Sequence, residues 1–102
     1  MSHVVLLGDS IFDNAAYVPG KPSVIDQLKS RLPKGWDATL LAVDGHVTDD
    51  VVGQTARLPE DVSHLVVSCG GNDALGYSSL LFEPAQSVNE VLQRFAGVRM
   101  EF

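Results

Sequence analysis

Two short motifs carry the side chains that could do chemistry in this chain. Gly8–Ile11, which reads Gly-Asp-Ser-Ile, follows the apolar run Val4–Leu7. Gly70–Asp73, which reads Gly-Gly-Asn-Asp, follows a second apolar run, Leu65–Cys69. A serine hydroxyl attacks a carbonyl carbon once a base removes its proton, and an asparagine amide can stabilise the oxyanion that forms. The two motifs together therefore indicate acyl transfer.

Three residues are the candidates for this chemistry. Ser10 lies in the turn after the first apolar run, where its hydroxyl would stand out of a sheet. Asn72 follows two glycines, which allow the sharp backbone turn that would aim its amide into a site. Gly45 follows another apolar stretch and could offer a backbone N–H. Because all these residue types are also common in ordinary turns, each motif alone is weak evidence.

The elements that must position these residues alternate between strand and helix. Buried strands are expected at the apolar runs Val4–Leu7, Ala38–Val43 and His64–Cys69. Helices are expected where apolar residues recur at helical spacing after a capping residue, at about 24–32, 48–56 and 87–95. Residues 70–77 are expected to form a loop. This alternation predicts a flavodoxin-like, three-layer α/β/α fold with a parallel sheet, in which the first strand lies between the other two.

A parallel sheet brings the expected site residues to one edge. The carboxyl ends of its strands lie together, and open α/β sheets bind their ligands there. Ser10, Gly45 and Asn72 each follow a predicted strand, so we expect them to converge at that edge.

The motifs, taken in order, resemble the first three signature blocks of the SGNH (GDSL-type) serine hydrolases, a family of esterases, lipases and thioesterases. The resemblance covers residues 1–102 as a single domain. It implies hydrolysis of a small carboxylic ester or thioester through an acyl-enzyme on Ser10. It also implies an oxyanion hole built from the N–H groups of Ser10 and Gly45 and the side chain of Asn72. No metal or organic cofactor is implied.

The family's last block, Asp-x-x-His, supplies the base and has no well-placed counterpart. Asp61 and His64 have the spacing, but His64 begins the third strand and should lie at the other end of the sheet, roughly 20 Å away. His46, next to Gly45, is the better-placed substitute base, or else a residue that lines the substrate cleft. We therefore expect the catalytic His and Asp outside this chain, which we interpret as the truncated N-terminal part of a hydrolase. The chain alone is expected to be a very poor esterase.

Composition narrows the classes of function. Hydrophobic residues make up 45% of the chain and the formal net charge is −6, which disfavours binding to nucleic acid or to anionic lipid. No stretch is long enough to span a bilayer, and the first residues do not resemble a signal peptide, so a cytoplasmic location is expected. Cys69 is the only cysteine, which excludes an intramolecular disulfide and a Cys-based zinc site.

Two other classes of function remain open. A flavodoxin-like module could hold a nucleotide in the loop after the first strand, although Asp9 would repel phosphate and no Gly-x-Gly-x-x-Gly or Walker motif is present. A non-catalytic or split-enzyme subunit could be completed by another chain or by self-association. The third strand would favour that, because Val66 and Val67 make its open edge apolar.

Overall fold

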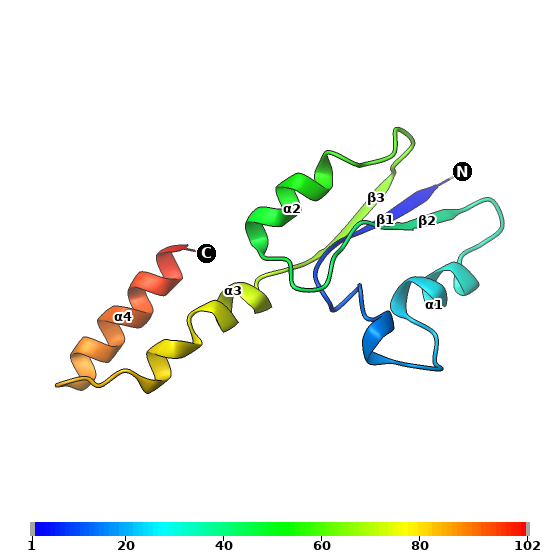
Figure 1. Ribbon diagram of the computed structural model, residues 1–102. Coiled ribbons are helices and arrows are strands. Elements are labelled where there is room, and N and C mark those ends of the chain that lie inside the picture. Colours follow the sequence, from blue (N-terminus) through cyan, green and yellow to red (C-terminus); the bar gives the residue numbers. More distant parts are fainter. Residues whose placement is uncertain (1, 102) are drawn as a thin grey trace.

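A three-stranded parallel sheet forms the centre of the computed structural model, which describes residues 2–101. The strands are β1 (His3–Gly8), β2 (Asp37–Leu40) and β3 (His64–Ser68), and their order is β2-β1-β3 (Figure 1). The predicted α/β class and the predicted position of the first strand are therefore confirmed.

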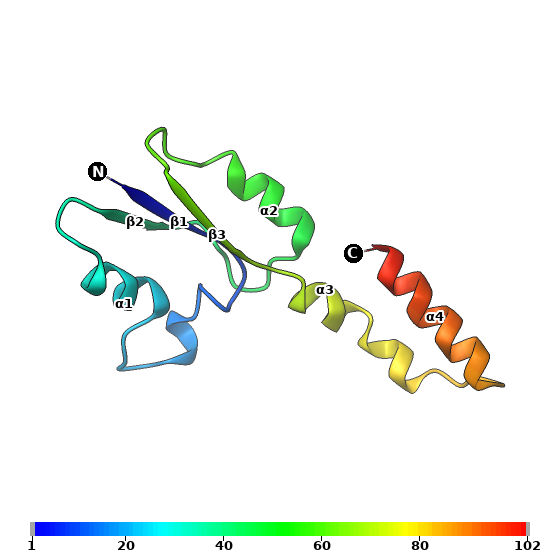
Figure 2. The ribbon, with the colours of Figure 1, turned by 180° about the vertical axis from the view of Figure 1, so that it is seen from behind.

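β1 forms the core because both of its faces are covered. All of its residues are buried, and Val5 and Leu7 are 0% and 1% exposed. The helix α1 (Val24–Arg31) packs against β2, and α2 (Thr48–Thr55) packs against β1. Figures 1 and 2 show these two helices on opposite sides of the sheet. A continuous apolar strand suits this position, since neither of its faces meets water.

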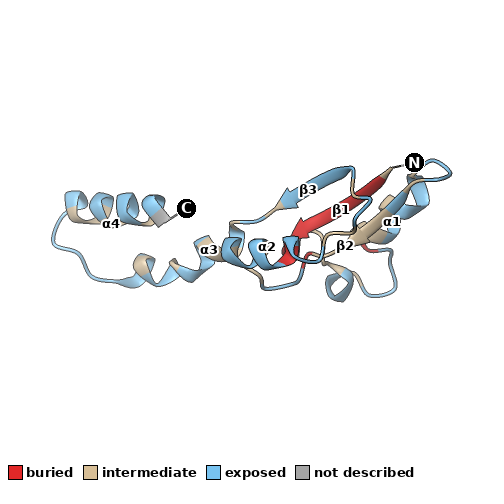
Figure 3. Cartoon of the chain, turned by 90° about the horizontal axis from the view of Figure 1, so that it is seen from above, coloured by how far each residue is buried: buried red, intermediate tan, exposed pale blue. Residues whose placement is uncertain are grey.

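β3 is not the buried strand that its apolar sequence predicts. Leu65, Val66 and Val67 are 51%, 44% and 51% exposed. Within residues 2–101, β3 pairs with β1 alone, and Figure 3 shows it exposed beside the buried β1. The predicted open apolar edge is present, and the faces of the strand are open as well.

β2 is shorter than the strand predicted to reach Val43. It ends at Leu40, after which the N–H groups of Leu41 and Ala42 both donate to the carbonyl of Leu6, at 2.9 and 3.0 Å. Two residues of one strand thus lie opposite one residue of its neighbour, as in a β-bulge, and regular pairing ends there. The N–H of Val43 still reaches the last carbonyl of β1, at 3.1 Å, so the chain stays beside β1 up to the next turn.

The segment expected as a loop after β3 is helical. α3 spans Gly71–Gly76, and a short 3₁₀ helix, η2, spans Ser78–Phe82. Glycine and asparagine normally indicate a turn, but here the left-handed Gly70 (φ 106°) makes the bend and the helix begins directly after it. α4 spans Val88–Glu101 and so continues past the predicted end at residue 95.

The helices after β3 extend away from the sheet (Figures 1 and 2). The chain measures 60 × 32 × 18 Å, and its radius of gyration is 17.8 Å, compared with about 13 Å for a compact domain of this length. Apolar side chains of α4, including Val88, Leu92 and Phe95, are exposed. In the described part of the chain, no helix has both the length and the apolar character needed to cross a membrane.

Candidate functional site

The three expected site residues follow strands whose carboxyl ends lie at the same edge of the sheet. β1 and β3 end together, because Gly8 pairs with Ser68, and the chain after β2 meets β1 at the carbonyl of Gly8. Ser10 follows β1 by two residues, Gly45 lies in the turn after β2, and Asn72 lies in the first turn of α3, just beyond β3. This edge is the one at which parallel sheets bind ligands.

Ser10 lies in a tight turn that Asp9 holds in place. Asp9 is buried; its side-chain Oδ1 accepts the N–H of Ile11 at 3.1 Å. Its carbonyl accepts the N–H groups of Phe12 and Asp13, at 3.1 and 3.0 Å. Ser10 is half-buried, and its hydroxyl makes no hydrogen bond with any residue between 2 and 101. The candidate nucleophile therefore has no base beside it within that range.

Gly45 occupies a turn position that favours glycine. The N–H of His46 donates to the carbonyl of Val43 at 3.1 Å, which closes a four-residue turn. Gly45 has φ 88°, in the left-handed region that such turns require at their third residue. The N–H of Asp44 is also used, because it donates to the side chain of Asp13 at 2.8 Å. The turn is thereby fixed on both sides of Gly45.

The backbone N–H groups of Ser10 and Gly45 have no acceptor among the described residues. Their neighbours differ: the N–H groups of the residues immediately before and after each of the two are hydrogen-bonded. Donors that are fixed in direction but not used by the protein are what an oxyanion hole needs. The two groups predicted to stabilise an oxyanion are thus available for a ligand.

Asn72 lies against the turn that carries Gly45. Its side-chain Nδ2 donates to the carbonyl of His46 at 2.9 Å, so one of its two amide hydrogens is used and the other remains for a ligand. The next residue, Asp73, accepts both the N–H and the hydroxyl of Thr48, each at 2.9 Å. Thr48 is the first residue of α2. These bonds join α3 to the start of α2.

Tyr17 fixes the loop after β1 to the Gly45 turn. It ends the short 3₁₀ helix η1 (Ala15–Tyr17), and its hydroxyl donates to the carboxylate of Asp44, with oxygen distances of 3.0 and 2.8 Å. This hydrogen bond, together with the negative charge of Asp44, raises the pKa of the Tyr17 phenol. The loops that carry Ser10 and Gly45 are therefore joined by a direct contact.

Gln54 is the important residue that sequence reasoning missed. It is buried on α2, and its Oε1 accepts the N–H of Gly8 at 2.8 Å. Its Nε2 donates to the carbonyl of Gly8 at 2.7 Å and lies 2.9 Å from Nδ1 of His46. The available signal was its spacing from Val51: the two residues are three positions apart in the predicted helix, which puts a polar side chain beside an apolar one on the same helix face.

A cavity of about 430 Å³ lies beside this network, between α2 and the chain that follows β2. His46 and Gln54 contribute to its wall, with the charged residues Asp49, Asp50 and Arg57 of the α2 region. His46 therefore lines a cavity next to the predicted site.

His64 lies at the opposite end of the sheet from Ser10, as the sequence predicts. It is the first residue of β3 and pairs with Val4, whereas Ser68 pairs with Gly8 at the other end. Four residues of strand separate the two ends by about 13 Å. Its ring packs against Trp36, with centroids 5.3 Å apart. His64 and Asp61 are thus not placed to activate Ser10.

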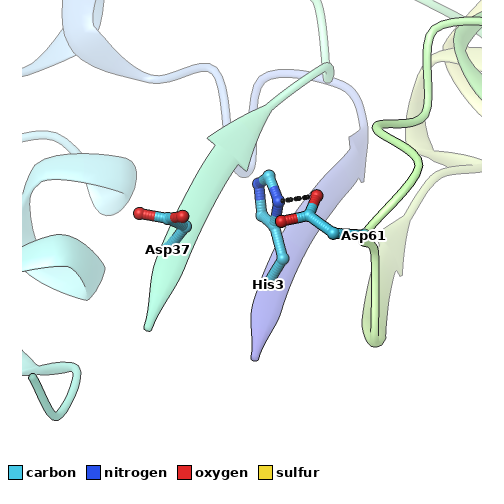
Figure 4. A group of neighbouring side chains, drawn as sticks. All are labelled: His3, Asp37 and Asp61. Carbon is cyan, nitrogen blue, oxygen red and sulfur yellow. Dashed lines mark hydrogen bonds and ion pairs between the residues drawn. The ribbon is translucent and has the colours of Figure 1, made fainter. Parts of the chain in front are cut away.

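A second polar cluster at this far end was not predicted. His3, Asp37 and Asp61 bring potential metal-ligand atoms within 4.8 Å of one another (Figure 4). His3, however, donates from Nδ1 to Asp61 at 2.8 Å, and its Nε2 is 2.6 Å from the hydroxyl of Thr39. The hydrogen bond from His3 lowers the pKa of Asp61. Because both ring nitrogens are used within the protein, we interpret this cluster as a structural link between the strands and the segment before β3.

The candidate site thus combines a serine in a tight turn, two N–H groups without an acceptor in the described part of the chain, and one asparagine amide at the carboxyl edge of the sheet. Comparison with models of known protein families, with characterised proteins and with solved structures finds no match. The case for a function therefore rests on these residues and their geometry.

Proposed function

We propose that this chain is the N-terminal part of an SGNH-type serine hydrolase, which cleaves a carboxylic ester or thioester through an acyl-enzyme on Ser10. The observation that carries the proposal is the pair of N–H groups at Ser10 and Gly45 that have no acceptor among residues 2–101, in turns whose neighbouring donors are hydrogen-bonded. The Asn72 amide beside the Gly45 turn supports it as a third donor.

Each group has a role in the proposed reaction. The hydroxyl oxygen of Ser10 attacks the substrate carbonyl carbon, and the carbonyl oxygen becomes a tetrahedral oxyanion. The N–H groups of Ser10 and Gly45 and the remaining amide hydrogen of Asn72 donate to that oxyanion. One such donor contributes about 2.7–4 kcal/mol to stabilisation of the transition state. Collapse expels the alcohol or thiol, and water then releases the acid from Ser10.

The proton of Ser10 requires an acceptor from outside the described residues. The resemblance assigns that task to a histidine oriented by an aspartate. Removal of the histidine from a serine-protease triad lowers turnover by about 10⁶-fold. We therefore expect acylation of Ser10 by an activated ester to be slow but detectable, with little turnover.

The test is acetylation by p-nitrophenyl acetate, followed by peptide mapping with mass spectrometry. We expect acetyl-Ser10 in the wild type, none in Ser10→Ala, and an acylation rate about 10²–10³-fold lower in Asn72→Ala. Ser79→Ala, which changes an exposed serine of η2, is the matched control and should behave as the wild type. Imidazole in the buffer, which can accept the proton, should accelerate acetylation of the wild type.

Two results would contradict the proposal. Acetylation confined to lysines or to the N-terminus would show that Ser10 is not a nucleophile. An Asn72→Ala rate equal to that of the wild type would remove Asn72 from the oxyanion hole. Fast turnover that depends on Ser10 would instead show that a base lies within the chain, and His46 would be the first residue to test.

A second candidate, a subunit completed by another polypeptide, is favoured by the exposed residues of β3, Leu65–Val67. A strand added at this edge would pair with its free backbone groups and cover apolar side chains. Native mass spectrometry of the purified chain tests this. A stoichiometric partner that supplies a histidine to Ser10 would unite the two candidates, whereas a monomer at all concentrations would contradict self-association.

A further inference from the structure

The orientation of the Gln54 side chain is determined by its contacts with Gly8. The backbone N–H of Gly8 can only donate, so the atom 2.8 Å from it must be the amide oxygen of Gln54. The carbonyl of Gly8 can only accept, so the atom 2.7 Å from it must be the amide nitrogen. Exchange of the two amide atoms would break both bonds in a buried position, which excludes the flipped orientation.

This orientation determines the tautomer of His46. The second hydrogen of the Gln54 amide points to Nδ1 of His46, at 2.9 Å. A nitrogen that accepts a hydrogen bond carries no proton, so the neutral ring of His46 carries its proton on Nε2. Nε2 has no partner among residues 2–101. His46 therefore offers a hydrogen-bond donor, whereas the lone pair that a general base would use is occupied by Gln54.

The charged residues that line the cavity restrict the charge of a ligand that could bind the Nε2–H of His46. Asp49, Asp50 and Gly53 of α2 line the cavity, together with Arg57, which lies two residues beyond the end of that helix. A side chain at Gly53 would meet no atom within 4 Å, so its absence leaves open space there. Two carboxylates against one guanidinium disfavour an anionic ligand. The Nε2–H of His46 can only donate, so it pairs with an acceptor such as the oxygen of an uncharged carbonyl group.

We infer that Gln54 is a positioning residue that holds His46 as the Nε2–H tautomer, so that the cavity beside α2 binds an uncharged carbonyl compound through this N–H. The inference does not require Ser10 to react. If the proposed hydrolase function holds, the inference adds the substrate class that this side of the site accepts, namely esters or thioesters without a free carboxylate near the carbonyl.

The tautomer is measured directly by long-range ¹H–¹⁵N correlation spectra of the histidine rings, at a pH where the rings are neutral. We expect the Nε2–H pattern for His46. His3 is an internal control with the opposite expectation, because its Nδ1 donates to the carboxylate of Asp61, which can only accept. An Nδ1–H pattern for His46 in the wild type would overturn the inference.

Gln54→Glu tests the positioning role. A carboxylate at this place cannot donate to Nδ1 of His46, so the ring should change to the Nδ1–H tautomer while the pattern of His3 stays the same. An unchanged His46 in a folded Gln54→Glu variant would show that Gln54 does not determine the tautomer. If this variant does not fold, the wild-type spectrum still decides the inference.

Butyramide and butyrate test the ligand class without any turnover. We expect butyramide to shift the Nε2 resonance of His46 saturably and to leave His3 unchanged, with butyrate binding roughly five- to tenfold more weakly. Gly53→Leu should fill the cavity and abolish the butyramide shift while His46 keeps its tautomer. No saturable shift with butyramide, or tighter binding of butyrate, would overturn the proposed ligand class. Ser10 acetylation is independent of these readouts, so failure of either proposal is recognisable separately.

Discussion

A methyl group at Gly8 should separate β1 from β3 at the edge that carries the candidate site. The Cβ of an alanine there would overlap the carbonyl oxygen of Ser68 and lie 2.7 Å from its carbonyl carbon. Both atoms belong to the backbone of the paired strand, so no side-chain rotation relieves the overlap. Gly8 also has φ 127°, which residues with a side chain rarely adopt.

The expected loss of stability follows from these two effects. Insertion of a methyl group into a packed interior destabilises by about 1–3 kcal/mol, and a strained backbone conformation adds about 1–3 kcal/mol. Gly8→Ala should therefore lower the free energy of unfolding by roughly 2–6 kcal/mol, out of the 5–15 kcal/mol typical of folded proteins. A shift of β1 that relieved the overlap would stretch both hydrogen bonds between Gly8 and Gln54.

The assay is urea denaturation followed by far-ultraviolet circular dichroism. Gly8→Ala should lower the midpoint, with a slope near that of the wild type if the variant still folds. Gly53→Ala is the matched control, because a Cβ there meets no atom within 4 Å and the site is in the interior of α2. That variant should be more stable by about 0.5–1 kcal/mol. Equal midpoints for Gly8→Ala and the wild type would show that β1 and β3 do not approach as described.

Three further predictions concern charge and association. The hydrogen bond from His3 lowers the pKa of Asp61; this carboxylate therefore stabilises the fold above about pH 3.9, and its contribution is lost as the pH falls through the lowered pKa. Asp61→Asn should flatten the acid limb of a stability–pH profile, and an unchanged limb would contradict this. Asp44→Ala should lower the pKa of Tyr17 toward about 10 in an alkaline absorbance titration, whereas an unchanged titration would place the two groups apart. Val66→Lys should reduce any concentration-dependent association seen by sedimentation, because it puts a charge on the exposed strand; association unaffected by it would locate the contact elsewhere.

The strands and their order can be predicted from the sequence because each strand is indicated by a short run of neighbouring residues. Val4–Leu7 is apolar at every position, which requires cover on both faces. The alternation of strands with helices predicts a parallel sheet with β1 between the other two strands. The same reasoning fails for Leu65–Val67, where an equally apolar run is exposed. Apolar sequence shows that a strand needs cover, but the cover must come from other segments. The helix at Gly71–Gly76 was predicted as a loop, because glycine and asparagine, which are typical of turns, also occur where helices begin.

The residues of the candidate site also fall into some that the sequence predicts and some that it does not. Ser10, Gly45 and Asn72 could be placed from sequence because each follows a predicted strand. The link from Gln54 to Gly8 joins residues 46 positions apart, and the link from His3 to Asp61 joins residues 58 positions apart. Such contacts depend on the register of the strands and on how α2 packs against β1. The spacing of Gln54 indicates its helix face, but no motif identifies the partner that either side chain contacts.

Ser10 differs from the other motif residues in having no structural task. Gly8 is required by the close approach of β3, Gly45 by its turn, and Asn72 donates to the carbonyl of His46. The Ser10 hydroxyl makes no such contact within residues 2–101. Ser10→Ala should therefore change the free energy of unfolding by no more than about 0.5 kcal/mol, while it abolishes acetylation.

Urea denaturation and peptide mapping of the same Ser10→Ala preparation check both halves of this prediction. A large loss of stability would mean that the hydroxyl serves the fold. In that case the loss of acetylation would no longer identify a nucleophile. Unchanged stability with no acetyl-serine leaves chemistry as the reason for a serine at the carboxyl end of β1.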